Sequence, residues 1–426
     1  MNYNEYLKKK IIPSFGCTEP IALAFAASRA KTLLKNNPKK ITARLSGNII
    51  KNVNSVKVPG TLGRKGIEIS LAAGAFLGDY RKNLEVLSDI DKSQLENLDK
   101  LIADGLVEVV LVHEKTGLYI DLSLQDDTNQ SQVIIEGYHT NIVFERFNDE
   151  ILLDKRDGKE AEEEDIDFTF DKIYDFAKST DYREIKDVLD LQISYNYDIA
   201  KEGINNDWGA NIGKMVLPNS DGYNYDKLVA YAAAGSDARM SGCEKPVVIN
   251  SGSGNQGLTV SVPIIVYSKD NNIEDEKLYR ALIFANLLGL YIKQGIGELS
   301  AYCGVVTAGA SSVCGIAFIN DEDPSVIKEI LANALATNSG IICDGAKESC
   351  AMKIASSLKM AFLAYDQAKS NNSFKAGDGI VKDDIDQMIK TVGHIARYGM
   401  KETDKVILEE MIGDWRILEP IIKIEI

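Results

Sequence analysis

The sequence predicts an α+β protein with an N-terminal α+β domain, whose sheet is mainly antiparallel, and a larger, mainly α-helical domain. Three observations predict this. The 426 residues are enough for two or three domains of ordinary size. Alternating β-branched runs gather in the first third of the chain, and apolar residues at helical spacing fill most of the remainder. We expect the N-terminal domain at 1–154, a charged linker at 155–167 and the helical domain at 168–426.

The N-terminal domain is expected to begin with a helix over 20–34, followed by a strand near 40–49 and a helix near 66–78. Another helix is expected near 93–105. Four runs with alternating apolar residues come next, and short turn segments separate them, which favours an antiparallel sheet. The runs are LVEVVLVHE, GLYIDLSLQ, SQVIIEGYHT and NIVFERF.

The second domain is expected to follow the stretch KRDGKEAEEEDID, which is too charged to form a core and indicates a solvated linker. Its helices are predicted in DFTFDKIYDFAK, YDKLVAYAAAGSDARM, DEKLYRALIFANLLGLYIKQ and DPSVIKEILANALATN. The longest uncharged run, 299–320, is diluted by Gly, Ser and Thr. It therefore favours a buried helix pair over a membrane span.

The overall charge limits the class of partner. A formal net charge of −15 argues against binding to nucleic acid and to anionic membrane surfaces. The first residues, MNYNEYLKKKIIPSFG, lack the apolar core of a signal peptide. Six cysteines in such a chain point to thiols, metal binding or catalysis and not to a disulfide framework. We expect a cytoplasmic protein that acts on a small molecule. The sequence is compatible with a homo-oligomer but does not specify one.

Cys303, Cys343 and Cys350 lie in a polar, glycine-rich part of the chain and are candidate ligands of an iron–sulfur cluster. Asp344 is expected to cap a helix, and a separation of seven residues is two helical turns, so Cys343 and Cys350 would share one face. Their spacing fits buried core cysteines equally well. It also does not exclude Cys314, which follows Cys303 by three turns if that stretch is helical.

Cys17 comes directly before the first predicted helix, with Thr18 as its expected N-cap and Pro20 in its first turn. A helix N-terminus lowers the pKa of a thiol, which makes Cys17 a candidate nucleophile or general base. The alternative is a turn cysteine without a role.

The segment INSGSGNQG formally matches the dinucleotide pattern G-x-G-x-x-G after a strand. Pro263 interrupts the run that follows, and no second apolar strand comes after it, which argues against a dinucleotide site. A turn rich in backbone N–H groups suits a small carboxylate better, and a purely structural turn is the remaining alternative. The candidate carboxylate-binding residues are Ser251, Ser253, Gly254, Asn255 and Gln256.

His139 lies in EGYHTNI, where polar residues interrupt an apolar strand pattern. It is either a structural histidine or a residue that transfers a proton or positions the substrate. Thr140 and Asn141 beside it are candidate substrate-binding residues.

Taken together, GCTEPIALA, EGYHTNI, INSGSGNQG, ELSAYCGVV and ICDGAKESCAMKI resemble the L-cysteine desulfidase family, which is related to the α-chain-like part of iron–sulfur L-serine dehydratases. The resemblance covers most of the chain. It implies an oxygen-sensitive [4Fe-4S] enzyme that does not use pyridoxal phosphate. It also implies that Cys303, Cys343 and Cys350 hold the cluster and that Cys17 is catalytic, whereas Cys243 and Cys314 keep a structural interpretation.

The resemblance implies β-elimination of L-cysteine to pyruvate, ammonia and hydrogen sulfide. We expect an open cluster iron to act as Lewis acid and Cys17 to remove the α-proton, with His139 as a second catalytic candidate. Thr18 and Glu19 join the candidate substrate-binding residues. The alternatives are L-serine dehydration on the same cluster and a non-catalytic metal-binding protein.

Overall fold

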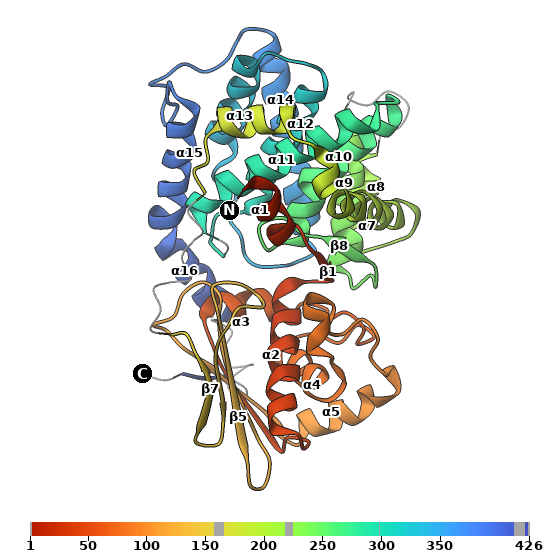
Figure 1. Ribbon diagram of the computed structural model, residues 1–426, viewed down its shortest axis with the longest axis vertical. Helices are drawn as coiled ribbons and strands as arrows, with labels where there is room; N and C mark the ends of the chain where they lie inside the picture. Colours follow the sequence, from red (N-terminus) through yellow and green to blue (C-terminus); the bar gives the residue numbers. More distant parts are fainter. Residues whose placement is uncertain (1, 157–165, 218–224, 298, 413–421, 425–426) are drawn as a thin grey trace. The chain divides into compact units, whose positions relative to one another are not determined.

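The computed structural model describes residues 2–156, 166–217, 225–297, 299–412 and 422–424 (Figure 1). It confirms the predicted α+β fold. Contacts divide the chain into two compact units. Unit 1 consists of Met1–Pro13, Ile166–Cys343 and Glu348–Lys401, and unit 2 of Ser14–Asp165, Asp344–Lys347 and Glu402–Ile426.

These units differ from the predicted domain boundaries because the chain passes between them more than once. The first helix belongs to unit 1, and the short segment Asp344–Lys347 belongs to unit 2 together with the C-terminal part of the chain. Apolar faces pack wherever they meet, so a compact unit need not be continuous in sequence. Residues 157–165 of the predicted linker lie outside the described residues.

Unit 2 contains a seven-stranded sheet with the strand order β7-β6-β5-β4-β2-β3-β9. The pairs β2–β4, β4–β5, β5–β6 and β6–β7 are antiparallel, whereas β2–β3 and β3–β9 are parallel. Its strands are β2 (Lys40–Leu45), β3 (Val107–Leu111), β4 (Tyr119–Gln125), β5 (Gln130–Glu136), β6 (Ile142–Phe147), β7 (Glu150–Asp154) and β9 (Ile422–Ile424). The sheet is thus mainly antiparallel, as expected, with a parallel edge.

The helices of unit 2 include α2, which packs on β4 and β5 and against α4 (Figure 1). Gly74 permits the close approach of α4 to α2, because a Cβ there would lie 2.2 Å from the carbonyl oxygen of Ala24. This packing fixes α2, whose first turn carries candidate site residues. The helices are α2 (Thr18–Leu34), α3 (Gly47–Val53), α4 (Ile67–Leu77), α5 (Leu95–Ala103), α16 (Lys401–Ile412) and the short 3₁₀ segments η1 (Tyr80–Glu85) and η2 (Lys92–Gln94).

Unit 1 is mainly helical, as predicted. Its elements are α1 (Tyr3–Lys10), α6 (Phe170–Ser179), η3 (Tyr182–Ile185), α7 (Lys186–Asn205), α8 (Ile212–Val216), α9 (Asp226–Met240), β8 (Pro246–Val248), α10 (Gly254–Asp270), α11 (Asp275–Ile296), α12 (Gly304–Ile319), α13 (Pro324–Asn338), α14 (Cys350–Lys369), α15 (Ile385–His394) and η4 (Ile395–Gly399). The short strand β1 (Pro13–Phe15) lies where the chain leaves unit 1 for unit 2.

Helix α12 forms the centre of unit 1, since every one of its residues is buried and it packs against α10, α11, α13 and α14 (Figure 1). It occupies most of the uncharged run 299–320, so the expected helix pair is wrong: the run forms one helix, and the residues before it are irregular except for a bridge between Tyr302 and Ile342. Among the described residues, no helix combines the length and the apolarity that a membrane crossing requires.

Candidate functional site

The three candidate ligand cysteines all lie in unit 1. Cys303 is the N-cap residue of α12, and Cys350 is the first residue of α14. The segment before Cys303 pairs with the segment before Cys343: Cys303 N donates to Ile341 O at 3.0 Å, and Cys343 N donates to Ala301 O at 2.6 Å. Two backbone hydrogen bonds therefore hold Cys303 and Cys343 next to each other.

The electrostatics of Cys303 show that the Cys343 and Cys350 thiols both act on it. A hydrogen bond with Cys343 raises the pKa of Cys303 well above its usual value, with burial and the charges of Cys343 and Cys350 acting in the same direction. Within the described ranges, no group of three His, Cys, Asp or Glu side chains forms a metal-ion site. The thiols are therefore grouped electrostatically without closing around a single ion.

The helix expected between Cys343 and Cys350 is not present, and the expectation that Asp344 caps it is wrong. Helix α14 begins at Cys350, with Ser349 as N-cap, and the preceding segment is irregular. Gly345 has φ +94°, a left-handed value that a helix does not contain. The two thiols are thus positioned by a loop and a helix start, not by one helix face.

The two cysteines interpreted as structural are buried in unit 1. Cys314 is completely buried on α12, and burial raises the pKa of its thiol. Its Sγ donates to the carbonyl oxygen of Ile327 at 3.8 Å. Burial also raises the pKa of Cys243 to about 11. Both environments disfavour the thiolate that binds metals.

The glycine turn leads into α10, whose N-cap is Ser253, so the expectation that Pro263 interrupts the run is wrong. Pro263 lies inside the helix. The dinucleotide interpretation still lacks its second strand, because α11 follows α10. Ser251 adopts a left-handed φ of +50°, and its hydroxyl donates to Asn250 Oδ1 at 2.8 Å.

The carboxylate candidates in this turn have different surroundings. Asn255 Oδ1 accepts hydrogen bonds from the Ser236 hydroxyl at 3.2 Å and from Arg239 Nη1 at 3.1 Å, which ties the turn to α9. Gln256 lies against Gly304, where a Cβ would be only 2.4 Å from the Gln256 amide carbon. Since Gly304 directly follows Cys303, the turn and the three thiols occupy the same part of unit 1.

Arg239 was missed by the sequence reasoning. Its side chain is only 4% exposed, and its guanidinium carbon would lie 2.6 Å from a Cβ on Gly254. A buried guanidinium beside a turn rich in N–H groups adds positive charge to the region expected to bind a carboxylate. The only sequence signal was an arginine in an alanine-rich apolar helix.

Unit 2 contains a second buried polar cluster at the start of α2. Cys17 takes the N-cap position, so the expectation that Thr18 caps the helix is wrong. Glu19 Oε2 accepts hydrogen bonds from the Cys17 thiol at 3.2 Å and from the Thr18 hydroxyl at 3.0 Å. Glu19 Oε1 accepts one from Asn52 Nδ2 at 3.0 Å. Asn52, on α3, was not singled out in the sequence.

Glu19 is ionised in this cluster although it is only 7% exposed. Burial by itself would raise the pKa of Glu19, but the charge of His139 and the hydrogen bonds from Cys17, the Glu19 backbone and Thr18 lower it overall. His139 is 6% exposed, and in the described structure its Nε2 atom has no hydrogen-bond partner. Cys17, Thr18, Glu19 and His139 thus form one electrostatic group.

Asn141, a neighbour of His139 in the sequence, uses its side chain in the adjacent turn and not in this group. Asn141 Nδ2 donates to the Glu136 carbonyl at 2.8 Å and so stabilises the turn between β5 and β6. Thr140 and Asn141 are both partly exposed. This arrangement gives Asn141 a structural role in the turn.

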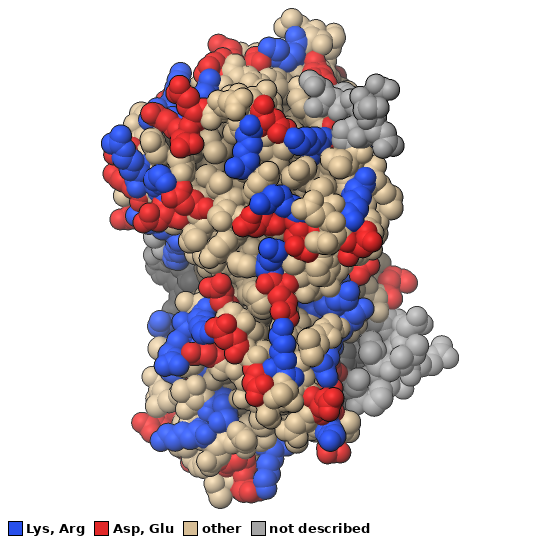
Figure 2. Space-filling model, turned by 90° about the vertical axis from the view of Figure 1, so that its right-hand side faces the viewer, with Lys and Arg blue, Asp and Glu red and all other residues tan. Residues whose placement is uncertain are grey.

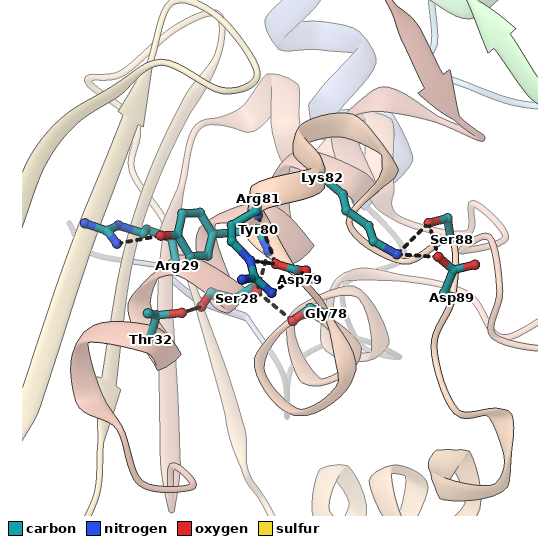
Figure 3. Close-up of polar contacts among 10 residues, drawn as sticks. All are labelled: Ser28, Arg29, Thr32, Gly78, Asp79, Tyr80, Arg81, Lys82, Ser88 and Asp89. Atoms are coloured by element: carbon teal, nitrogen blue, oxygen red, sulfur yellow. Dashed lines mark hydrogen bonds and ion pairs between the residues drawn. The ribbon is translucent and has the colours of Figure 1, made fainter.

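Elsewhere in unit 2, a solvent-open hollow of about 420 Å³ lies between α2 and η1. Its polar groups bond to one another, for example Asp79 to Arg81, and Arg29 donates to the Tyr80 hydroxyl (Figure 3). None of the predicted site residues lines it. The lining residues are Ser28, Thr32, Gly78, Asp79, Tyr80 and Arg81.

The molecular surface in Figure 2 shows basic side chains interspersed with acidic ones. Unit 2 also has ion pairs such as Lys39–Asp127 and Arg64–Asp99. The face in view therefore has no continuous basic area of the kind that binds a phosphate backbone.

Comparison with known proteins assigns this chain to a family. The family model described as serine dehydratase alpha chain matches residues 81–409. A protein of Finegoldia magna named UPF0597 is 43% identical over 414 residues, which covers 96% of this chain and 99% of the relative. UPF0597 proteins of Lachnoclostridium phytofermentans and Treponema denticola are 42% and 40% identical, each over at least 96% of this chain and 98% of the relative. The chain therefore belongs to the serine dehydratase alpha chain family.

Proposed function

We propose that this protein is a [4Fe-4S]-dependent lyase that converts L-cysteine to pyruvate, ammonia and hydrogen sulfide without pyridoxal phosphate. The family supports a lyase of the dehydratase type with an iron–sulfur cluster. The observation that carries the proposal is the grouping of Cys303, Cys343 and Cys350, whose thiols act on one another in unit 1. Thiolates are the ligands that iron–sulfur clusters use.

The residues present fit such a cluster in their chemistry. Three cysteines supply three ligands, and the two remaining cysteines of unit 1 lie in environments that keep a thiol protonated. When bound, a cluster with three protein ligands supplies one iron with an open coordination position, a Lewis acid suited to a sulfur leaving group.

In this proposal, Cys17 Sγ removes the α-proton of the substrate. Its thiol donates to Glu19 Oε2, and this bond fixes the direction of the sulfur. A thiolate beside an ionised carboxylate would be disfavoured by like charge, and the charge of His139, which already lowers the pKa of Glu19, offsets that repulsion.

The substrate carboxylate is assigned to the turn before α10. Ser251 and Ser253 present polar groups there, Gln256 presents one in the first turn of α10, and Arg239 supplies buried positive charge through its contact with Asn255. A carboxylate is well matched to a guanidinium and backbone N–H donors.

A second candidate function is dehydration of L-serine on the same residues, which the family description favours. It differs only in the leaving group, a hydroxyl in place of a thiol. The third alternative, a non-catalytic metal-binding protein, does not explain why Cys17, Glu19 and His139 form a buried charged group.

The deciding experiment is anaerobic reconstitution with iron and sulfide, followed by assays for sulfide and pyruvate from L-cysteine and for pyruvate from L-serine. We expect a brown protein with visible absorption and a kcat/KM at least tenfold higher for L-cysteine. A reversed ratio establishes the serine dehydratase. A colourless zinc protein without activity on either amino acid contradicts both enzyme assignments.

A further inference from the structure

The cluster around Glu19 contains an unused hydrogen-bond acceptor on Asn52. This residue lies in the last turn of α3 and is 5% exposed. Its Nδ2 atom donates to Glu19 Oε1 at 3.0 Å. Because an ionised carboxylate only accepts hydrogen bonds, the Asn52 nitrogen must face Glu19 and the oxygen must face away. Within the described part of the chain, Asn52 Oδ1 has no hydrogen-bond partner.

A buried acceptor without a partner is destabilising, because it has lost its hydrogen bonds to water and gained none in the fold. Such an atom can accept a hydrogen bond from a group outside the chain, either a ligand or a water molecule. The negative charge of Glu19 beside it selects for a donor that is positively charged. The Cys17 thiol donates to the same carboxylate, so this donor would lie in the same cluster as the proposed base.

Gly345 faces Asn52 Oδ1, and a residue with a side chain at this position would crowd that oxygen. A Cβ on Gly345 would lie 3.0 Å from Asn52 Oδ1 and 2.7 Å from the carbonyl oxygen of Lys51. Lys347 Nζ donates to the carbonyl oxygen of Asn54 at 2.6 Å and holds this segment on the end of α3. All of these residues belong to unit 2.

We propose that Asn52 Oδ1 binds the α-ammonium group of the amino-acid substrate, with Glu19 as the nearby counter-charge. The assignment rests on the proposed function and adds a specificity-determining residue to it. The ammonium supplies the missing donor to Asn52, and its charge complements the carboxylate. Asn52 and Cys17 donate to the two oxygens of the same carboxylate, so an amine bound to Asn52 lies in the same cluster as the proposed base. The site therefore selects α-amino acids over acids without the amine.

The chain contains a matched control residue in unit 1. Asn4 is also 5% exposed, its Nδ2 donates to the carboxylate of Glu184 at 2.6 Å, and in the structure as described its Oδ1 atom has no hydrogen-bond partner. In contrast to Asn52, no candidate catalytic thiol shares the carboxylate of Glu184. Replacing Asn4 therefore reproduces the loss of a buried asparagine without touching the proposed subsite.

The test compares L-alanine with propionate, which differ in the α-amine and have no leaving group. Their binding is measured as protection of Cys17 from iodoacetamide, followed by mass spectrometry of the reconstituted protein. We expect Asn52→Leu to weaken L-alanine binding by about 10- to 100-fold, the loss typical of one hydrogen bond to a charged group, and to leave propionate binding within about twofold. Asn4→Leu should change neither.

The outcomes separate this inference from the proposed function. Equal weakening of both ligands, or of neither, overturns the ammonium assignment, and the first result would indicate a structural role or a bound water. The absence of sulfide and pyruvate formation by the wild type overturns the proposed function, whatever Asn52 does. If Asn52→Leu does not fold, Asn52→Ser is judged by the same ratio of L-alanine to propionate affinity.

Discussion

Two buried carboxylates, Glu19 in unit 2 and Asp237 in unit 1, have pKa values that shift in opposite directions. Glu19 in unit 2 accepts hydrogen bonds from Cys17, Thr18 and Asn52, and its pKa is lowered. Asp237 in unit 1 is 1% exposed, and burial raises its pKa to about 6. Asp237 Oδ2 accepts from the backbone of Gly213, but its Oδ1 atom has no hydrogen-bond partner among the residues described.

The surroundings of Cys17 in unit 2 and of Cys303 in unit 1 also differ in charge. The Cys17 thiol faces a group whose charge His139 balances. Cys303 instead faces two other thiols, each of which makes its ionisation harder. The difference indicates that the thiol of unit 2 lies beside a carboxylate whose pKa is lowered, whereas the thiols of unit 1 require a cation before they can be thiolates together.

The largest expected effect is loss of the cluster. Cys303→Ala, Cys343→Ala and Cys350→Ala should each lower iron and sulfide content after anaerobic reconstitution and reduce activity by at least about 1000-fold, because each removes a ligand. Cys243→Ala is the control and should keep full iron content. Full iron content in any of the three variants would remove that cysteine from the ligand set.

The Cys17→Ala variant tests whether the thiol of unit 2 takes part in catalysis without binding the cluster. We expect it to keep the visible absorption of the wild type but to lower kcat by about 100- to 10,000-fold, the range typical of a lost general base. Parallel measurements of the absorption spectrum and of pyruvate release check this. Loss of iron together with activity would show that Cys17 is a ligand, and unchanged kcat would exclude it from the mechanism.

The two carboxylates predict opposite dependence of stability on pH. Ionised Asp237 costs stability that is absent below its unfolded pKa of 3.8, grows up to about pH 6 and then stays constant. Asp237→Asn should therefore raise the free energy of unfolding by up to about 3 kcal/mol at pH 7.5, and by much less at pH 4. Urea unfolding at both pH values measures the difference, and an equal gain at both would contradict the assignment.

Glu19→Gln should behave in the reverse way. Because the pKa of Glu19 is lowered in the folded state, its ionised form contributes stability above about pH 4.5, and this contribution is lost as the pH falls through the lowered pKa. The variant should be less stable than the wild type at pH 7.5, and the deficit should shrink towards pH 4. A deficit that does not depend on pH would point to packing and not to charge.

The smallest expected effect concerns the carboxylate turn of unit 1. Ser251→Ala should raise the KM for the amino acid by about three- to tenfold with little change in kcat, since it removes one polar group from the turn. Asn255→Ala should mainly lower stability, because Asn255 Oδ1 connects the turn to Ser236 and Arg239. Steady-state kinetics and thermal unfolding of the two variants separate these roles. An unchanged KM in Ser251→Ala would argue against carboxylate binding there.

Local pattern was sufficient for much of the fold. The helix over 20–34 and the alternating runs of the sheet could be predicted, because each depends on the spacing of apolar residues within one segment. The same reasoning was wrong between Cys343 and Cys350. Small residues and Asp344 are typical of a helix start, but Gly345 adopts a left-handed φ where the segment packs on α3.

The candidate site was likewise predictable only in part. The sequence by itself determined which residue types are available: three cysteines in a glycine-rich region, a thiol at a helix start and a histidine in a polar turn. Only the tertiary structure decided which of them meet. It joined Glu19 to Asn52 and Gln256 to Gly304, and it gave Arg239 and Asn52 their importance. Burial and charge depend on segments that are distant in the chain, and no local pattern specifies those contacts.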